Sequence, residues 1–247
     1  MYKRQTLEYK KAKISTVEHC LAALVGMQVD NALIKINGSE LPILDGSSKP
    51  FTDAISKIGV VEQDEKRTFI EITEEISYFD SNNGVRFKIL PSDKFELEVK
   101  IDYNSKVLGV QNAYLENIQD FQSTIAASRT FCFLHELNNL YENNLIKGGN
   151  LNNAVVFVDR EIKDEEAYML EKVLNKSEIE INDHGFLSNT DLRFENEPAR
   201  HKLLDIIGDL ALLGKPIKGK VIAFKPGHAA NVAFAKLINK KIYSNII

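Results

Sequence analysis

The stretch Asn196-Glu-Pro-Ala-Arg-His-Lys-Leu-Leu-Asp-Ile-Ile-Gly-Asp-Leu210 carries the strongest helical pattern in this sequence. Its apolar residues recur at the spacing of one buried helix face. Pro198 stands in the first turn, where a helix tolerates proline, and Gly214 suits the position after the last turn. The sequence therefore predicts a largely buried helix over residues 196–213.

Polar side chains interrupt the apolar face of this helix. His201 and Asp205 are four residues apart, so they lie one above the other, and Asp209 continues the same face. Carboxylates on a buried helix are costly unless they are paired or bind a metal ion. Two interpretations stay open: a hydrogen-bonded His–Asp pair with a capping aspartate, or one part of a metal site.

Two further histidines stand beside chemically useful neighbours. Glu18-His19 opens an apolar helical stretch, although the spacing Ser15-x-x-Glu18 also predicts a capping box, which would give Glu18 a structural role. Gly227-His228 lies at a strand-to-helix turn, where a histidine is either an ordinary surface residue or a group that titrates near neutrality.

Combined, these groups specify a catalytic arrangement. Two histidines and an aspartate supply three ligands and leave a fourth position for water, as in catalytic rather than structural zinc sites. The same ligands suit Fe²⁺. Glu18 can then act as a general base and His228 as a general acid, with Asp209 available to orient or charge one of them.

The remaining sequence alternates helical and strand patterns. Period-two segments around a turn at Asn82-Asn83-Gly84 predict a hairpin. Strands are expected at 31–37, 68–78, 85–90, 95–103, 154–158 and 220–224, and helices at 19–27, 49–58, 133–144, 164–174 and 229–240. This mixture predicts an α+β fold in two layers of similar design, with the polar run 61–67 as a candidate linker.

Composition excludes several classes of protein. The 247 residues carry 31 Lys+Arg against 35 Asp+Glu, which gives no electrostatic reason to expect a nucleic acid partner. Two cysteines cannot form a disulfide framework. No segment approaches the roughly 18 apolar residues of a membrane span, and the N-terminus lacks the pattern of a signal peptide. We therefore expect a cytoplasmic protein, and we expect it to be a monomer.

Linked motifs occur along nearly the whole chain. They are Ser15-Thr-Val-Glu-His-Cys-Leu-Ala-Ala-Leu24, Pro42-Ile-Leu-Asp-Gly-Ser-Ser48, Ser128-Arg-Thr-Phe131 followed by Gly148-Gly-Asn-Leu-Asn-Asn-Ala154, the stretch from Asn196 to Leu210, and Gly227-His-Ala-Ala-Asn231. Together and in this order they resemble the UDP-3-O-acyl-N-acetylglucosamine deacetylase family, zinc enzymes of the committed step of lipid A synthesis in Gram-negative bacteria.

The resemblance implies a role for each matching residue. The metal ligands would be His19, His201 and Asp205. The proton-transfer groups would be Glu18 as the base that activates the attacking water and His228 as the acid that protonates the leaving amine, with Asp209 as its partner. Thr130 would help to hold the oxyanion, and the positions near the sugar and diphosphate would be Phe131, Lys202 and Lys225.

The resemblance also implies an architecture. We expect two similar α+β domains, residues 1–62 and 63–247, with the active site between them. Residues 134–158 fall where the family has an insert that lines an apolar passage for the acyl chain, and the apolar side chains there are Leu137, Leu140, Leu145, Ile146 and Leu151. The family's first metal motif follows several strands, so we expect this chain to be shortened at its N-terminus. The sequence Glu197-Pro-Ala-Arg200 resembles the corresponding segment of those family members that are fused to a 3-hydroxyacyl-carrier-protein dehydratase.

The implied function is zinc-dependent hydrolysis of the N-acetyl group of UDP-3-O-(3-hydroxyacyl)-N-acetylglucosamine, which gives acetate and UDP-3-O-acyl-glucosamine. One alternative is an inactive fragment that serves as a metal-binding or interaction module, because an absent sheet would leave an apolar face uncovered. Another is a related zinc hydrolase that acts on a different acylated sugar nucleotide.

Overall fold

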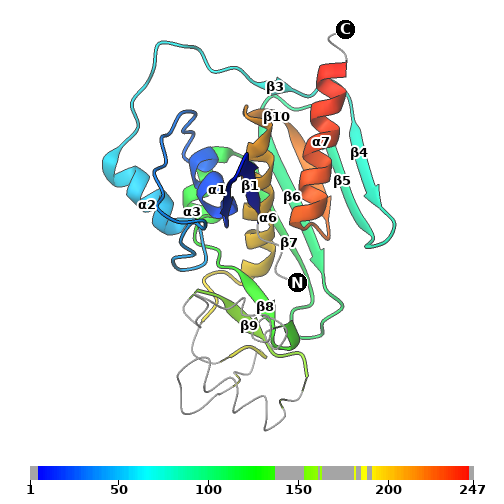
Figure 1. Ribbon diagram of the computed structural model, residues 1–247. Helices are drawn as coiled ribbons and strands as arrows, with labels where there is room; N and C mark the ends of the chain where they lie inside the picture. Colours follow the sequence, from blue (N-terminus) through cyan, green and yellow to red (C-terminus); the bar gives the residue numbers. More distant parts are fainter. Residues whose placement is uncertain are drawn as a thin grey trace.

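One large β-sheet forms the framework of the protein (Figure 1). The computed structural model describes residues 5–136, 153–160, 162, 181, 185–187 and 191–244. Within this part of the chain the sheet contains β3 (Ile70–Glu71), β4 (Ile76–Asp80), β5 (Val85–Leu90), β6 (Phe95–Asp102), β7 (Val110–Leu115) and β10 (Ile217–Phe224). The strand order is β4-β5-β10-β6-β7, and β3 pairs with the first residues of β10.

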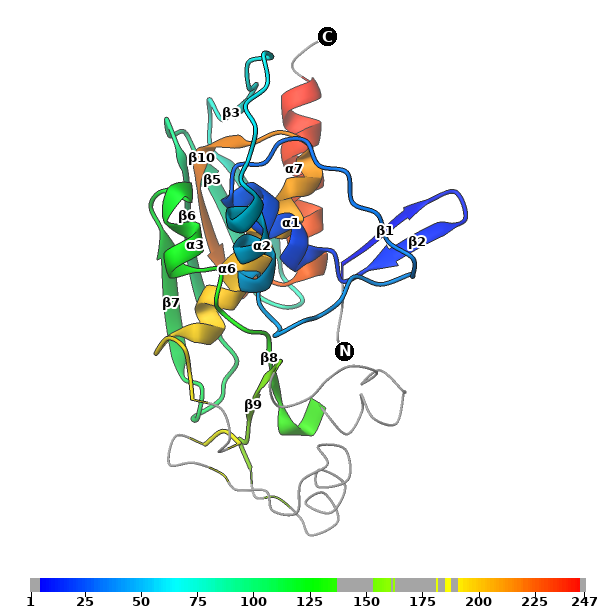
Figure 2. The same cartoon turned by 90° about the vertical axis from the view of Figure 1, so that its left-hand side faces the viewer.

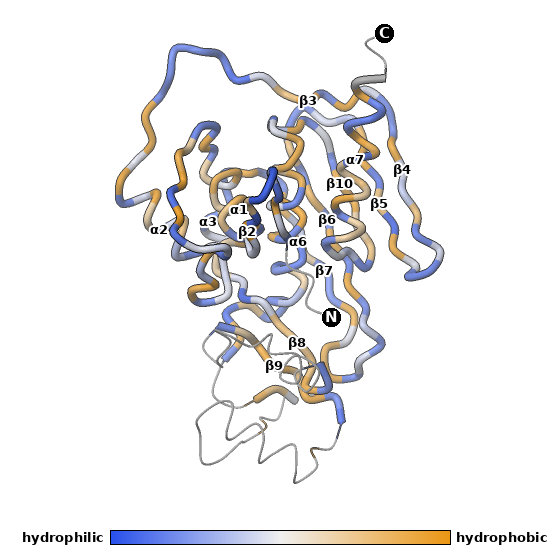
Figure 3. Tube along the Cα trace, viewed as in Figure 1, coloured by the Kyte–Doolittle hydropathy of each residue, from blue (hydrophilic) through white to orange (hydrophobic). Residues whose placement is uncertain are grey.

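Strand β10 lies in the middle of this sheet although it comes last in the chain. It runs antiparallel to β5 and parallel to β6, so that Val221 lies between Ile89 and Leu97. Its side chains alternate between buried and half-buried positions along the whole strand. Figure 3 shows the corresponding alternation of hydrophobic and hydrophilic residues along β5. One face of the sheet therefore belongs to the core.

Helices α6 (Glu197–Leu210) and α7 (His228–Ser244) cover that face. The chain also forms α1 (Glu18–Gly26), α2 (Lys49–Ile58) and α3 (Phe121–Thr124), with short 3-10 turns η1 (Ile118–Asp120) and η2 (Ala211–Leu213). Figure 2 shows α6 and α7 on the same side of the sheet. Helix α6 contacts β6 and β7, α7 contacts β4, and α1 packs against α6. The mixed α+β class is confirmed.

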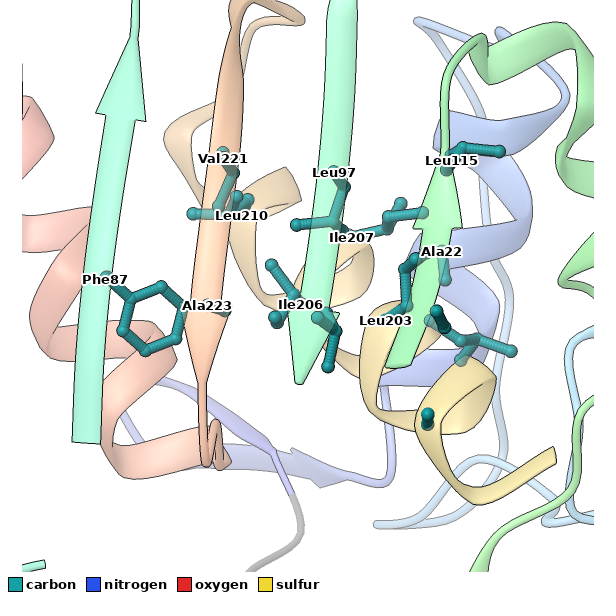
Figure 4. Packing of buried hydrophobic residues seen from close by; sticks show 14 of the residues in the cluster. Ala22, Phe87, Leu97, Leu115, Leu203, Ile206, Ile207, Leu210, Val221 and Ala223 are labelled. Carbon is teal, nitrogen blue, oxygen red and sulfur yellow. The ribbon is translucent and has the colours of Figure 1, made fainter. Parts of the chain in front are cut away.

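The predicted helix over residues 196–213 is confirmed as α6 followed by η2. Pro198 lies in its first turn, and Gly214 ends it with a left-handed φ of 75°. Its buried residues Leu203, Ile206 and Leu210 fill the space between the helix and the sheet (Figure 4). Tight packing of this kind makes α6 a rigid support for the polar side chains on its other faces.

Several other predicted elements are confirmed. The turn at residues 82–84 joins β4 to β5, and Gly84 adopts the positive φ of 66° that such a turn requires. The predicted strand at 154–158 is β9 (Val155–Phe157), which pairs in parallel with β8 (Phe131–Phe133). No helix among the described residues is long and apolar enough to cross a membrane.

Two predictions of local structure are wrong, and three strands were not predicted. Residues 31–37 form no strand, because they pair with none of the described strands, and Leu33 there is 84% exposed. The single strand expected at 68–78 is divided, since β3 pairs with β10 whereas β4 pairs with β5. The helix expected from Phe133 starts one residue later in its described part, since Phe133 ends β8 and residues 134–136 are helical. Two strands, β1 (Thr6–Tyr9) and β2 (Ala12–Ser15), form a hairpin that the sequence did not predict, and the sequence likewise missed β7.

Some predictions fall outside the described residues. They are the helix at 164–174, most of the helix at 133–144, and the five apolar side chains assigned to the acyl passage, Leu137, Leu140, Leu145, Ile146 and Leu151.

Candidate active site

The candidate site lies where helix α1 crosses α6. Gly208 of α6 permits a very close approach, because a Cβ at this position would lie 2.2 Å from the carbonyl oxygen of Glu18. The first turn of α1, which carries Glu18 and His19, is therefore held directly against the helix that carries His201 and Asp205. Side chains separated by about 180 positions in the sequence meet there.

We expect the Gly208→Ala variant to be less stable than the unsubstituted protein. Alanine is the better helix former by roughly 1 kcal/mol, but forcing a methyl group into a filled contact costs about 1–3 kcal/mol, and here the neighbouring atom is backbone. The measurement is urea unfolding. Gly38→Ala is the control, since a Cβ at Gly38 meets nothing within 4 Å. Equal stability of the Gly208 variant and the unsubstituted protein would contradict the close approach.

Three buried side chains converge at this crossing. His19, His201 and Asp205 each offer one ligand atom, and these atoms lie within 4.8 Å of one another. The Asp205 Oδ1 atom is 3.4 Å from His201 Nε2 and 3.9 Å from His19 Nε2. The two imidazole rings are nearly perpendicular, with centroids 5.0 Å apart. This is a compact N,N,O donor set.

The ligand atoms are available to a cation. His201 Nδ1 lies 3.0 Å from the carbonyl oxygen of Ser128, which can only accept, so Nδ1 carries the proton and Nε2 keeps its lone pair. Burial lowers the pKa of His201, and burial together with the neighbouring His201 lowers the pKa of His19 to about 3. Both imidazoles are therefore neutral near pH 7, the form that binds metals.

Asp205 supplies the observation that fits a metal ion best. Its Oδ1 atom is buried and has no hydrogen-bond partner among the described residues, whereas Oδ2 accepts a hydrogen bond from Lys202 Nζ at 2.7 Å. Burial raises the pKa of Asp205, but the charges of Lys202 and the nearby histidines outweigh burial and hold this pKa far below its usual range. A buried, ionised oxygen without a donor is costly unless a cation compensates it. The arrangement also excludes a simple hydrogen-bonded His201–Asp205 pair.

A second cluster of titratable groups adjoins the first. His228 Nδ1 is 2.7 Å from Asp209 Oδ2, and its Nε2 atom points toward Glu18, 3.8 Å from Oε1, and toward Asp205, 4.0 Å from Oδ2. The His228 side chain is only 14% exposed, so it is not the ordinary surface residue that one interpretation predicted. Asn231 Nδ2 also donates to Asp209 Oδ2, at 2.8 Å.

The environment shifts the pKa values of Glu18 and His228 in useful directions. Burial raises the pKa of Glu18 to about 7, although the charge of His228 partly opposes this shift. Burial lowers the pKa of His228, but the charge of Asp205 and the hydrogen bond to Asp209 outweigh burial and raise it to about 9. A carboxylate and an imidazolium thus coexist between these two values, as a base and an acid acting in one reaction require.

The capping box predicted at Ser15 is wrong. Ser15 belongs to β2, and its backbone N–H donates to the carbonyl oxygen of Ser39. Val17 occupies the N-cap position of α1 without a side-chain cap. Because pairing in the β1–β2 hairpin fixes Ser15 away from the helix end, Glu18 forms no capping box with it, and its carboxylate faces His228.

The four remaining site candidates lie at different distances from the donor set. Lys202 contacts Asp205 directly, and its Nζ atom lies 5.6 Å from the centre of the Phe131 ring, which itself stands edge-on to His201. Thr130, the residue before Phe131, is half-buried, and its backbone N–H donates to the carbonyl oxygen of Gly46. Lys225 forms an ion pair with Asp102 at 3.2 Å, and no contact joins it to the donor set among the described residues.

Sequence reasoning assigned no role to several residues that support the site. Asn231 shares Asp209 with His228, and its position three residues after His228 was a usable signal, because residues at that spacing share a helix face. Ser48 donates from Oγ to the carbonyl oxygen of His19 at 2.7 Å. That contact joins residues 29 positions apart, so no local sequence pattern predicts it.

Comparisons with known proteins agree on one family. Residues 2–176 and 167–240 match the family described as UDP-3-O-acyl N-acetylglycosamine deacetylase, LpxC. The chain is 42% identical over 239 residues to the bifunctional enzyme LpxC/FabZ of Porphyromonas gingivalis, covering 97% of this chain and 52% of that protein. It is 42% identical over 238 residues to the enzyme of the same name from Chlorobaculum tepidum, covering 95% of this chain and 51% of that protein.

A shorter relative is covered more completely. The UDP-3-O-acyl-N-acetylglucosamine deacetylase of Chlamydia pneumoniae is 37% identical over 235 residues, which span 94% of this chain and 74% of that protein. The chain thus spans about half the length of the bifunctional relatives and about three quarters of this one. From the five motifs, the match along almost the whole sequence and these identities, the chain belongs to the UDP-3-O-acyl N-acetylglycosamine deacetylase family.

Proposed function

We propose that this protein hydrolyses the N-acetyl group of UDP-3-O-(3-hydroxyacyl)-N-acetylglucosamine to acetate and UDP-3-O-acyl-glucosamine, with a divalent metal ion at His19, His201 and Asp205. Water adds its oxygen to the acetyl carbon, the amide C–N bond breaks, and the amine leaves with an added proton. The names of the relatives and the donor set both support this reaction.

The metal ion is Zn²⁺ in this proposal, and Fe²⁺ suits the same ligands. When bound, it supplies Lewis-acid polarisation of the amide carbonyl and makes a water molecule more acidic. Asp205 Oδ1, which lacks a hydrogen-bond partner among the described residues, would be satisfied by the ion. Lys202 holds the other oxygen of Asp205 and thereby fixes the direction in which Oδ1 points.

Glu18 and His228 carry the protons. Glu18 accepts a proton from the attacking water at a carboxylate oxygen, and His228 donates the proton on Nε2 to the departing nitrogen. Asp209 accepts the hydrogen bond from His228 Nδ1, so it orients the ring and stabilises the imidazolium. The observation that carries the proposal is that these two groups, 3.8 Å apart, lie beside a buried three-ligand set.

The substrate is proposed to lie across the Phe131 side of the donor set. Thr130 would help to hold the oxyanion, and Phe131, Lys202 and Lys225 would contact the sugar and diphosphate. The lysines are suited to an anionic diphosphate by charge. A two-domain layering with the boundary near residue 62, an acyl passage at 134–158, a cytoplasmic location and a monomeric state complete the proposal.

The test is an assay for acetate release from UDP-3-O-(3-hydroxyacyl)-N-acetylglucosamine, with metal content measured on the same sample. We expect stoichiometric metal and acetate release that a chelator abolishes and Zn²⁺ restores. An N-acetylated, O-acylated sugar nucleotide with a different sugar is the control substrate. Faster turnover of that control would favour the related hydrolase instead.

A non-catalytic role is the second candidate, and exposed apolar side chains favour it. Leu33, Ile58 and Val61 are 84–86% exposed, in and near the loops that flank α2. Contact with another polypeptide would cover such side chains. Bound metal without acetate release would support this interaction module and contradict the proposed hydrolysis.

The pH dependence of kcat/KM is expected to be bell-shaped. The rate rises as Glu18 loses its proton, with a pKa of about 7, and falls as His228 loses its proton, with a pKa of about 9. A bound divalent cation favours the deprotonated forms, so both limbs are expected at or below these values. In His228→Gln the alkaline limb should flatten while metal content stays intact. The acid limb should move upward, because the charge of His228 lowers the pKa of Glu18.

An alkaline limb that survives unchanged in His228→Gln would contradict the role of His228 as the acid. Its function would then be restricted to binding or structure.

A further inference from the structure

We propose that Glu197 and Arg129 act as a positioning pair for His201, through the peptide bond that joins Ser128 to Arg129. The proposal rests on the metal site of the proposed function and adds two residues to which the motifs assigned no role. Both side chains are buried, with Glu197 fully inaccessible and Arg129 4% exposed.

Glu197 is saturated with hydrogen bonds from Arg129 and from the backbone of Arg193. Its Oε1 atom accepts from the backbone N–H of Arg129 and from Arg129 Nε, each at 2.8 Å. Its Oε2 atom accepts from Arg129 Nη2 at 3.0 Å and from the backbone N–H of Arg193 at 2.8 Å. The guanidinium of Arg129 therefore donates two hydrogen bonds to the carboxylate, and the carboxylate also accepts one from the backbone N–H of Arg129.

The carbonyl oxygen of the same peptide group, that of Ser128, contacts His201. The N–H that Glu197 accepts and the carbonyl of Ser128 belong to one planar peptide group, in which the two point in opposite directions. Fixing the N–H therefore fixes the carbonyl, which accepts from His201 Nδ1 at 3.0 Å. Glu197 and His201 are four residues apart on α6, so both project from one face of a rigid helix toward this peptide.

Two consequences follow for the candidate ligand. The Ser128 carbonyl holds the proton on Nδ1 and leaves the lone pair of Nε2 directed toward Asp205. A carboxylate on the N–H also polarises the peptide and strengthens its carbonyl as an acceptor. A stronger acceptor makes the imidazole a better metal ligand, as in the carboxylate–histidine–metal arrangements of other proteins.

Fold stability alone is a weak reason for such a pair. Burying a carboxylate and a guanidinium carries a large desolvation cost, and well-packed apolar residues at such positions are often equally stabilising. The desolvation cost of the ion pair does not depend on its role. Its connection to the donor set is what separates this pair from a structural cross-link.

The test compares Glu197→Gln with Arg200→Met in the full chain. Glutamine removes the charge and leaves a single acceptor oxygen for the donors that Glu197 satisfies. Arg200 is the matched control, because it also anchors the first turns of α6, to Asn196 and to the carbonyl of Thr124, but does not touch the Ser128–Arg129 peptide. The readouts are the ¹⁵N shifts of the His201 imidazole in the metal-free protein, the Zn²⁺ affinity by chelator competition, and the melting temperature.

We expect the unsubstituted protein and Arg200→Met to show His201 with the proton on Nδ1 only and to bind Zn²⁺ equally well. Glu197→Gln should show a mixture of the two tautomers and bind Zn²⁺ about 10–100-fold more weakly, the usual effect of losing an outer partner of a ligand. A lower melting temperature with unchanged tautomer and affinity would overturn the proposal and leave the pair a structural cross-link.

Arg129→Lys decides the question if Glu197→Gln does not fold. Lysine keeps the buried positive charge but lacks the planar fork, so the expected result is the same mixture of tautomers with a smaller loss of Zn²⁺ affinity. Unchanged values in this variant would also overturn the proposal. Acetate release is not a readout here. If the variants show the tautomer and affinity changes but the unsubstituted protein releases no acetate, only the proposed function is contradicted.

Discussion

Replacing His201 by alanine is expected to abolish metal binding and acetate release together. The imidazole supplies one of three buried ligand atoms, and its Nε2 atom is 3.4 Å from Asp205 Oδ1. Two remaining protein ligands hold a divalent ion far less tightly than three. Metal content after dialysis and the deacetylation rate are the measurements.

The melting temperature provides an independent test of metal binding in the same variant. A metal that binds only the folded chain stabilises it by about 2.7 kcal/mol at a hundred times its dissociation constant. The melting temperature of the unsubstituted protein should therefore rise with added Zn²⁺, and that of His201→Ala should not. Unsubstituted protein stripped with a chelator is the control and should match the variant in activity. Full metal occupancy in His201→Ala would refute the ligand assignment.

Replacing Glu18 by alanine is expected to give the opposite combination: metal retained, activity reduced by roughly 10²–10⁴-fold, the usual contribution of a general base. Glu18 Oε2 is buried without a hydrogen-bond partner among the described residues, and Oε1 lies 3.8 Å from His228 Nε2. This carboxylate forms no capping box with Ser15, which lies in β2. Its removal should therefore leave α1 folded.

Glu8→Ala is the matched control for Glu18→Ala. Glu8 lies nearby in the sequence, but its side chain is 54% exposed and forms an ion pair with Lys13 at 3.0 Å, so its loss should change neither metal content nor rate. Circular dichroism and the melting temperature verify that both variants remain folded. A Glu18 variant that loses its metal, or that keeps its full rate, would contradict the role of base.

Elements whose stabilising interactions are local could be predicted from the sequence. Helix α6 has its apolar spacing, its early proline and its terminal glycine within one stretch, and it forms as predicted. The hairpin of β4 and β5 has its turn residues between alternating strands, and it also forms. In both cases the decisive contacts join residues a few positions apart, so the pattern contains the information.

Residues 31–37 show the limit of such patterns. Their alternation suits a strand, but a strand exists only with a hydrogen-bonded neighbour, and none of the described strands pairs with this segment. The capping box at Ser15 failed for a related reason. Its spacing is correct, but Ser15 is paired in the β1–β2 hairpin and therefore cannot cap helix α1.

The sequence by itself determined the fold class, the family and the i, i+4 pair of His201 and Asp205, because helix geometry fixes that spacing. Only the tertiary structure decided that His19 joins them and that Glu18 faces His228. Those meetings depend on the close crossing at Gly208 and on the return of the chain through β10 into α7. The physical reason is range: helix geometry acts over four residues, whereas the donor set is assembled by packing between segments about 180 residues apart.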